Sequence, residues 1–363
     1  MRGLHTRGTS CWLMGIRLVP FVAACILGCL SPIDFPVQNR GGQLVISGQI
    51  STLADRNLVQ VGITADTERL PFPVSGATVI LRDDFGNAFP YSEQFDKPGD
   101  YLLTHVAGVT GRSYFIEVTL EDGSMYRSAP EKMPGPTIID SLFYEVVNED
   151  VVDGEGTITN QDFVKTYIKA RLLPSESELF VKWTTEETFI LTPTDFPDTF
   201  AIMPPPCFIQ QNVDPQQVIL FDGRVVSSPS LQKQQVGSRI VDWSFLEKHY
   251  FTVYQSSLTM AAFSYWSKVK TIANPVNFLF DPPPGNLIGN IINEADPSEK
   301  ILGYFQAVNQ TFDRVFLLPA DLPRSLNIGT CNFNGSFNPG DYQPRCINCL
   351  GLSNSTLTRP VWF

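Results

Sequence analysis

Short segments that alternate apolar and polar residues recur along this chain, and this alternation constrains the fold more than any other feature. Between Gln43 and Met133 the segments QLVISGQIS, NLVQVGI and SYFIEVTLED are rich in β-branched and aromatic residues, and the turn signals DDFGN, KPGD and EDGS separate such segments. Successive side chains of a strand point to opposite faces, so this alternation is typical of half-buried strands. Residues 43–133 are therefore predicted to form an antiparallel β-sandwich.

The alternation continues beyond a proline-rich joint, KMPGPTIID, at Lys132–Asp140. The segments IIDSLFYEVV, KHYFTVYQSS and ILGYFQAVNQ favour strands, whereas apolar residues recur at helical spacing between 256 and 273. Residues 134–363 are predicted to form a larger, mainly β domain with one helix near 256–273. The fold class expected for the whole chain is mainly β.

The N-terminus has the layout of an export signal. Three arginines precede the apolar run LVPFVAACILG, which is shorter than the roughly 20 residues that a membrane span needs. The run ends in Ile26-Leu27-Gly28-Cys29, which resembles a bacterial lipobox. We predict a signal peptide over 1–28, lipidation of Cys29 and a short tether over 29–42; the alternative is an ordinary cleaved signal in which Cys29 has no special role.

Charge excludes one class of partner. Loss of residues 1–28 would remove three of the 26 basic residues and none of the 37 acidic ones, which leaves 23 against 37 and a formal net charge of −14. So acidic a chain lacks the basic patches with which proteins bind nucleic acid, so no nucleic-acid partner is expected. It would also be repelled by anionic lipid, so we expect it to stand off the membrane on its anchor.

Four cysteines follow the proposed anchor: Cys207, Cys331, Cys346 and Cys349. An even number in an exported protein predicts two disulfides, for which three connectivities are possible. The CINC spacing at 346–349 would also suit a zinc site or a redox motif. However, no histidine lies near these cysteines in sequence and no thioredoxin-like pattern surrounds them, so structural disulfides are favoured and no metal or other cofactor is expected.

A search for catalytic motifs finds none. The sequence has no Gly-x-Ser-x-Gly elbow, His-Glu-x-x-His or P-loop, and both His105 and His249 are interpreted as ordinary residues beside strands. Carboxylates are plentiful, so a hydrolase stays a third possibility. No catalytic residue is assigned, and a non-enzymatic function is expected.

Binding residues are sought among the aromatics and in one proline-rich loop. Aromatic residues make up 12% of the chain and concentrate in VDWSFLEKHYFTVY and FSYWSKV, where they either fill a core or form a binding face. The loop DPPPGNLIGNIIN would lose little entropy on docking. The candidate partner-binding residues are Trp266, Pro282, Pro283, Pro284 and Asn290.

Two resemblances refine these expectations. The order PVSGATVIL, GDYLL, TGRSYFIEV and DGSMYRS resembles the carboxypeptidase-regulatory sandwich, an immunoglobulin- or transthyretin-like fold. The segments at Phe280–Pro283, Gly289–Asn293 and Gly303–Phe305, the CINC motif and the terminal PVWF resemble the family called domain of unknown function 4249.

The second resemblance implies a compartment and a partner. It implies a Bacteroidota lipoprotein of the outer membrane, anchored by lipid and facing the cell surface. It also implies an accessory that docks a SusC-type TonB-dependent transporter and assists ligand capture or uptake. The alternative is a free-standing surface protein that binds glycans or peptides.

Overall fold

Antiparallel strands dominate the computed structural model, as the sequence predicts. The structure describes residues 42–65, 71–171, 179–192, 205–225, 230–273, 287–324, 326 and 348–363. The strands are β1 (Leu44–Ser51), β2 (Asn57–Ile63), β3 (Phe72–Pro73), β4 (Thr78–Asp83), β5 (Ala88–Pro90), β6 (Ser92–Gln94), β7 (Lys97–Leu103), β8 (Ser113–Thr119), β9 (Met125–Ser128), β10 (Glu131–Lys132), β11 (Ile138–Val152), β12 (Ile158–Arg171), β13 (Phe180–Leu191), β14 (Cys207–Asn212), β15 (Ile219–Asp222), β16 (Ser230–Ile240), β17 (His249–Leu258), β18 (Ile291–Asn293), β19 (Phe305–Leu317) and β20 (Ser355–Thr356).

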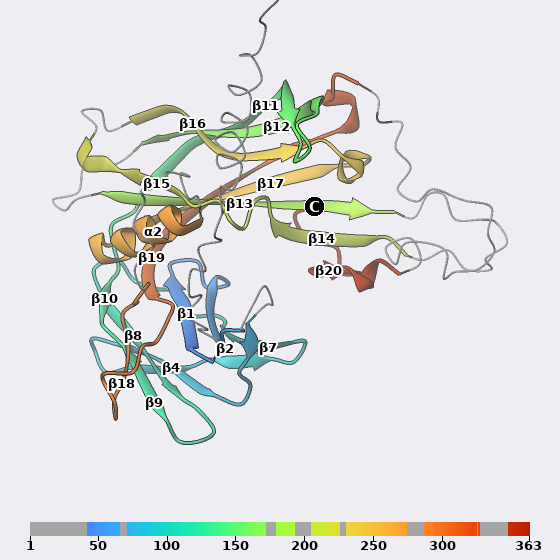
Figure 1. Cartoon of the computed structure of the whole chain (residues 1–363). Coiled ribbons are helices and arrows are strands. Elements are labelled where there is room, and N and C mark those ends of the chain that lie inside the picture. Colours follow the sequence, from blue (N-terminus) through green and yellow to red (C-terminus); the bar gives the residue numbers. More distant parts are fainter. Residues whose placement is uncertain are drawn as a thin grey trace, which may run out of the picture. The chain divides into compact units, whose positions relative to one another are not determined.

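The largest sheet runs through both regions of the chain (Figure 1). Its order is β20-β14-β13-β17-β19-β1-β2-β7-β6, with β15 paired to β13 and β3 paired to β2. Strand β19 makes this continuity possible, because its first residues pair in parallel with β1 and its later residues pair antiparallel with β17. One long strand therefore belongs to the N-terminal sandwich at one end and to the central sheet at the other.

The N-terminal sandwich contains strands from two distant parts of the sequence. A second sheet, β18-β9-β8-β4-β5 with β10, supplies Leu81 and Ile116 to a core that also takes Ile46 from β1. Ile291 and Phe305, from β18 and β19, are buried in the same core. The predicted boundary between 133 and 134 is thus crossed by backbone pairing and by packing, and Gly41–Phe363 form one unit.

Close backbone contact explains two glycines of the motifs that the sequence singled out. Gly303 has a φ of +94°, and a Cβ built there would lie 2.0 Å from the carbonyl oxygen of Ile46. A Cβ on Gly289 would lie 1.5 Å from the oxygen of Gly303. Only glycine fits at both positions, so these residues let the returning chain reach β1.

The central sheet is covered on its two faces by different elements. Ile168 of β12 and Val236 of β16 pack against Val181 and Trp183 of β13, so the three-stranded sheet β11-β12-β16 covers one face. Helix α2 (Met260–Ala273) packs on the opposite face through a cluster that includes Phe180. Because side chains alternate along β13, neighbouring residues contribute to the two layers.

The helix begins at Met260, later than the predicted start near 256. Ser256, Ser257 and Leu258 continue β17 and pair with β13, and the Thr259 hydroxyl then accepts a hydrogen bond from the amide of Ala262 (3.1 Å). Such a bond is a helix N-cap, and it sets the start of the helix. Of the helices in the described ranges, none is long and apolar enough to cross a membrane.

Candidate binding surface on the central sheet

Aromatic side chains line one face of β17 and β19. Tyr250 pairs with Phe316, and Tyr254 pairs with Phe312, so the rings stand opposite each other across the two strands. Their ring centroids are 5.6 and 5.7 Å apart. Thr252 and Arg314 pair between them. Period-two spacing on adjacent strands thus places four rings on one side of the sheet.

The C-terminal segment adds two more rings. Trp362 meets Tyr250 edge to face at 5.2 Å, and Phe363 lies 4.8 Å from Tyr250 and 5.1 Å from Phe208 of β14. These contacts fall in the range of favourable aromatic pairs. The set formed by the rings and the cations that lie over them is called the aromatic face: Tyr250, Tyr254, Phe312, Phe316, Trp362, Phe363, Arg56, Lys248 and Arg314.

The aromatic face has a buried base and an exposed top. Tyr250 and Tyr254 are buried, whereas Phe312 and Phe316 keep 47% and 46% of their surface exposed. The two half-exposed phenylalanines lie on the same face of β19, one on each side of Arg314, and together with the neighbouring rings they form an exposed aromatic surface. The face is therefore available to another molecule.

Three cations lie over these rings. The Arg56 guanidinium is 4.0 Å from the Tyr254 ring, Lys248 Nζ is 4.2 Å from the Phe316 ring, and the Arg314 guanidinium is 3.5 Å from the Trp362 ring. All three distances suit cation–π interactions. Arg56 also donates a 2.6 Å hydrogen bond to Glu186. Burial, followed by the charge of Glu186, raises the pKa of Tyr254 above its ordinary value.

The disulfide between Cys207 and Cys349 holds the C-terminal segment in place. It joins the first residue of β14 to a short 3₁₀ turn at Cys349–Gly351, and β20 then pairs with β14. A disulfide was predicted, and this one divides the CINC pair, so the local bridge within CINC does not form. Cys331 and Cys346 lie outside the described residues, as does Cys29, so their bonding stays a prediction.

The partner-binding residues proposed from the sequence lie elsewhere. Trp266 is half-buried on α2, donates from Nε1 to Gln306 Oε1 (2.7 Å), and carries Lys182 Nζ 3.6 Å over its ring. Burial lowers the pKa of Lys182 to about 7. Asn290 uses both ends of its amide on the backbone of Phe305, at 2.8 and 2.9 Å. The side chains of Trp266 and Asn290 thus form hydrogen bonds with other residues of the chain. Pro282, Pro283 and Pro284 lie outside the described residues.

Sequence reasoning found part of the aromatic face and missed the rest. The density of aromatics in the sequence points to the segment around Tyr250 and Tyr254, but it does not point to Phe312 and Phe316. The alternation in QTFDRVFL, at 310–317, carried the signal that both rings share a face. No local signal shows that β19 pairs with β17, because the paired residues are about 60 positions apart in the sequence.

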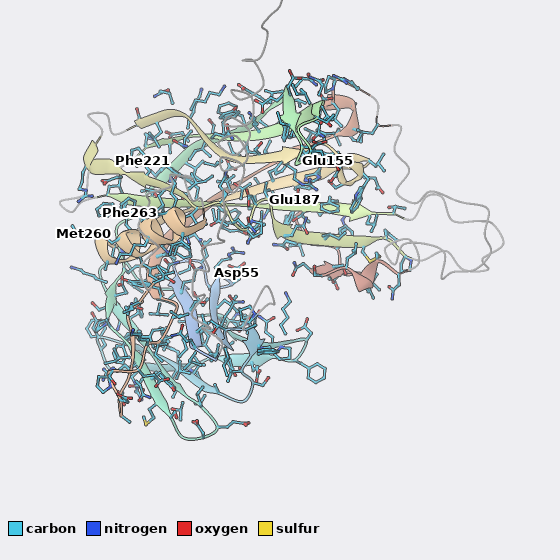
Figure 2. The ribbon with its side chains drawn as sticks, viewed as in Figure 1. Asp55, Glu155, Glu187, Phe221, Met260 and Phe263 are labelled. Carbon is cyan, nitrogen blue, oxygen red and sulfur yellow. A yellow bond between two sulfur atoms is a disulfide. The ribbon has the colours of Figure 1, made fainter. Side chains whose placement is uncertain are left out.

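A buried charged cluster lies on the other face of the central sheet. Glu187, labelled in Figure 2, accepts from Arg239 Nε at 2.9 Å and lies 3.1 Å from His249 Nε2. The His249 ring stacks on Phe245 at 4.0 Å and on Phe189 at 5.3 Å. His249 and Glu187 are fully buried, so this cluster ties β13, β16 and β17 together without access for a substrate.

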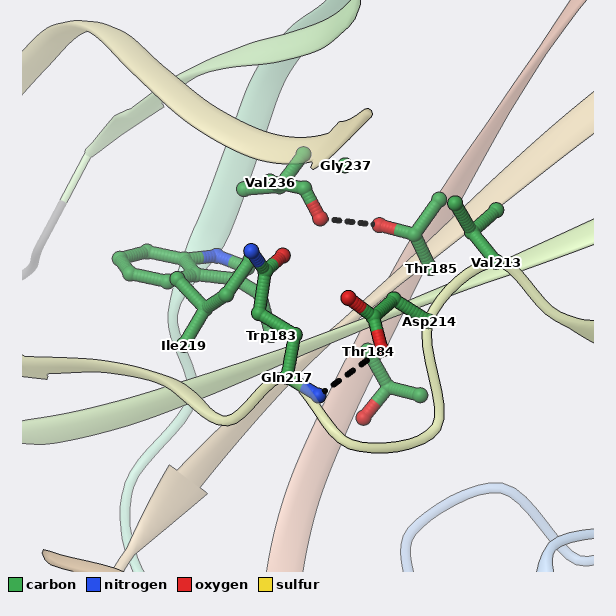
Figure 3. A pocket seen from close by; sticks show the side chains of 9 residues that line it. All are labelled: Trp183, Thr184, Thr185, Val213, Asp214, Gln217, Ile219, Val236 and Gly237. Carbon is green, nitrogen blue, oxygen red and sulfur yellow. Dashed lines mark hydrogen bonds between the residues drawn. The ribbon is translucent and has the colours of Figure 1, made fainter. Parts of the chain in front are cut away.

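A small pocket is lined by residues of β13 and β16 and by residues between β14 and β15 (Figure 3). Its volume of about 20 Å³ has room for one water molecule. The Thr185 hydroxyl donates to the backbone carbonyl of Val236 (2.6 Å), and the backbone N–H of Gln217 donates to the Asp214 carboxylate (3.2 Å). The pocket is too small for a metabolite. In the described ranges, no group of three or more His, Cys, Asp or Glu is placed to hold a metal.

The fold and the surface define a mainly β protein with an exposed aromatic face on its central sheet. The chain belongs to the family described as Domain of unknown function (DUF4249), whose model matches residues 31–314. This match confirms the family resemblance of the sequence. It ends at Arg314, so the C-terminal segment with Trp362 and Phe363 lies beyond the matched range.

Other comparisons add little. No curated protein matches the sequence. Seven solved chains match, one of them titled "Biofilm associated protein - BSP domain". That match covers 75% of this chain and 59% of the solved one, with 5% identity and a TM-score of 0.16. The chain thus spans less than two thirds of that structure, and a likeness so low carries no argument.

Proposed function

We propose that this protein is a non-enzymatic lipoprotein of the outer membrane, faces the cell surface, and docks a TonB-dependent transporter through the aromatic face. The observation that carries the proposal is the pair of half-exposed phenylalanines, Phe312 and Phe316. Cations lie over rings of the same face, Lys248 over Phe316 and Arg314 over Trp362. Aromatic residues and arginine are the types enriched at the energetic centres of protein interfaces.

Rigidity supports a docking role for this face. Phe312 and Phe316 lie on β19, which pairs with β17 along nine residues, from Asn309 to Leu317. The disulfide and β20 hold the C-terminal segment that carries Trp362. Groups fixed in this way lose little conformational entropy on binding, so more of the contact energy appears as affinity.

The N-terminal sequence supports membrane anchoring. Acylation of Cys29 would place the lipid 15 residues before Leu44, where β1 begins. A chain of that length reaches at most about 50 Å when extended. Such a tether allows an acidic protein to stay at the membrane while its sheet turns toward a partner. The family resemblance favours a transporter of the TonB-dependent class, for which the protein would assist ligand capture.

Replacement of Phe312 and Phe316 by threonine tests the docking role. Threonine keeps β propensity, so the fold should persist, while two interface anchors are lost. We expect recovery of the transporter from detergent-solubilised outer membrane to fall by roughly thirtyfold, which corresponds to about 2 kcal/mol of binding energy. Co-purification followed by mass spectrometry gives the measurement.

The matched control is a variant with Phe85 and Phe95 replaced by threonine, since both are exposed phenylalanines in the N-terminal sandwich. It should recover the transporter as the native protein does. Equal recovery with all three proteins would refute docking through the aromatic face. Saturable binding of a neutral glycan that depends on Phe312 and Phe316, with no transporter recovered, would favour the free-standing glycan-binding alternative.

A further inference from the structure

We propose that Arg314 is the recognition residue of the aromatic face and that it binds a carboxylate on an acidic segment of the partner protein. The proposal rests on the proposed docking function and specifies the chemistry of the partner. It is carried by the contacts of Arg314, by those of the other arginines, and by the spacing of residues along β19.

The Arg314 guanidinium is held flat within the aromatic face. Its Nε donates to the Thr252 hydroxyl (2.8 Å), and its centre lies 3.5 Å from the Trp362 ring and 5.6 Å from the Phe312 ring. A guanidinium has five N–H donors in a fixed plane and binds a carboxylate through two of them at once. The Thr252 and Tyr254 hydroxyls and the rings orient this plane, and among the described residues no carboxylate oxygen lies within 4.0 Å of it.

Other arginines of the described ranges satisfy their charge within the chain. Those with a carboxylate oxygen at 4.0 Å or less are Arg56, Arg82, Arg112, Arg127, Arg171, Arg224, Arg239 and Arg324. Arg359 binds the main-chain oxygen of Phe363. Within those ranges, neither Arg314 nor its neighbour on the face, Lys248, has an ion-pair partner.

The lack of a carboxylate partner is unusual among the arginines that the structure describes. The chain has 37 acidic residues against 26 basic ones, so carboxylates are available for pairing. Arg314 is half-buried, and Glu186, whose charge acts on it, is bonded to Arg56 (2.6 Å), so this partly desolvated cation has no ion-pair partner of its own. Burial also lowers the pKa of Arg314. A local positive charge on an acidic protein is complementary to an acidic partner surface, and such complementarity guides association.

The spacing along β19 defines the pattern of the segment. Arg314 lies two residues after Phe312 and two before Phe316, and residues two apart on a strand are about 6.7 Å apart on one face. An extended segment that runs along β19 would therefore place one acidic residue over Arg314 and one apolar residue over each phenylalanine. The expected pattern is apolar-x-acidic-x-apolar.

Two synthetic peptides test this pattern on the purified protein. One is acetyl-Phe-Ser-Asp-Ser-Phe-amide, and the other has asparagine in place of the aspartate. The indole ¹⁵N–H resonance of Trp362, assigned with Trp362→Phe, reports binding beside Arg314. We expect a saturable shift with the aspartate peptide and roughly tenfold weaker binding of the asparagine peptide, because only a carboxylate forms the charged bidentate bond.

Variants separate the guanidinium from the rest of the face. Arg314→Gln should bind both peptides with the weaker affinity, and Arg314→Lys should recover part of the difference because it keeps charge without the planar fork. Arg127→Gln is the control, since Arg127 lies over the Phe115 ring at 4.2 Å in the N-terminal sandwich. It should bind as the native protein does. Melting temperatures of all variants show whether each has folded.

Several outcomes would overturn the proposal. Two of them are equal affinity for the two peptides and no effect of Arg314→Gln. The others are no saturable binding of either peptide, and saturable binding of glucuronate by a protein that does not bind the aspartate peptide. The proposed docking function would still stand if transporter recovery depended on Phe312 and Phe316. Conversely, peptide binding through Arg314 without transporter recovery would refute the proposed partner and leave the carboxylate site in place.

Discussion

Replacement of Cys207 and Cys349 by alanine should lower the free energy of unfolding by about 4 to 5 kcal/mol. The two cysteines are 142 residues apart. A disulfide that closes a loop of this length lowers the entropy of the unfolded chain, which corresponds to about 5 kcal/mol of stability. Urea unfolding of the double variant and the native protein, compared at one pH, measures the difference.

The same variant should loosen the C-terminal segment. Trp362 and Phe363 reach the sheet through a segment that Cys349 and β20 hold against β14. Without the disulfide we expect iodide to quench the fluorescence of Trp362 more strongly. The contribution of Trp362 is obtained by subtracting the signal of the same protein with Trp362→Phe. A fall in the free energy of unfolding of less than about 1 kcal/mol, with unaltered quenching of Trp362 fluorescence, would mean that packing alone holds the segment.

Replacement of Glu187 by alanine should lower the free energy of unfolding by about 3 to 5 kcal/mol, because it breaks a buried ion pair with Arg239 and removes the hydrogen-bond partner of the buried His249. Glu187 is fully buried, and its loss would leave Arg239 paired only with Asp242 and would remove the carboxylate beside His249. Glu117→Ala is the control, since the Arg82–Glu117 pair is partly exposed and such pairs contribute under about 1 kcal/mol. Similar losses in the two variants would contradict the assignment of the buried cluster as a structural tie.

The buried carboxylate also gives a pH dependence. Burial raises the pKa of Glu187, but the hydrogen bond from His249 and the charges of His249 and Arg239 outweigh burial and hold that pKa below its ordinary value of 4.5. A carboxylate whose pKa is lower in the folded state stabilises that state at every pH above its pKa in the unfolded chain. This stabilisation is lost as the pH falls through the pKa of the folded state. Glu187→Gln should therefore flatten the loss of stability below about pH 4.5 in urea unfolding between pH 7 and 3.

The sequence predicted the type of structure well because alternation is a local signal. The strands of the N-terminal sandwich show it directly, as do β17 and β19. Family membership also followed from short motifs, of which Gly289 and Gly303 have a clear cause in backbone contact. One disulfide followed from the even number of cysteines and from the export that the N-terminal sequence predicts, although its pairing did not.

Long-range pairing was beyond the reach of local patterns. The parallel pairing of Gly48 with Phe305 joins residues about 250 positions apart, and nothing near either residue announces it. For the same reason a boundary at 133/134 was expected, although β18 and β19 complete the first sandwich. His249 is a strand residue as interpreted, but its buried contact with Glu187 spans 62 positions.

The aromatics show why candidate sites are harder to predict than folds. Some aromatic residues fill the core and others lie on the surface: Trp183 is buried and donates to Gln255, whereas Phe312 and Phe316 remain exposed. Which face of a strand is covered depends on the other layers, and a strand's own sequence does not carry that information. The aromatic face therefore emerged only once β17, β19 and the C-terminal segment were placed together.

Site-specific photo-crosslinking in living cells tests the docking claim most directly. Phe316 is replaced by p-benzoyl-phenylalanine, and a parallel strain carries the same group in place of the exposed Phe95 of the N-terminal sandwich. We expect irradiation to link position 316, and not position 95, to a TonB-dependent transporter identified by mass spectrometry. No transporter adduct at 316, or equal adducts at the two positions, would contradict it.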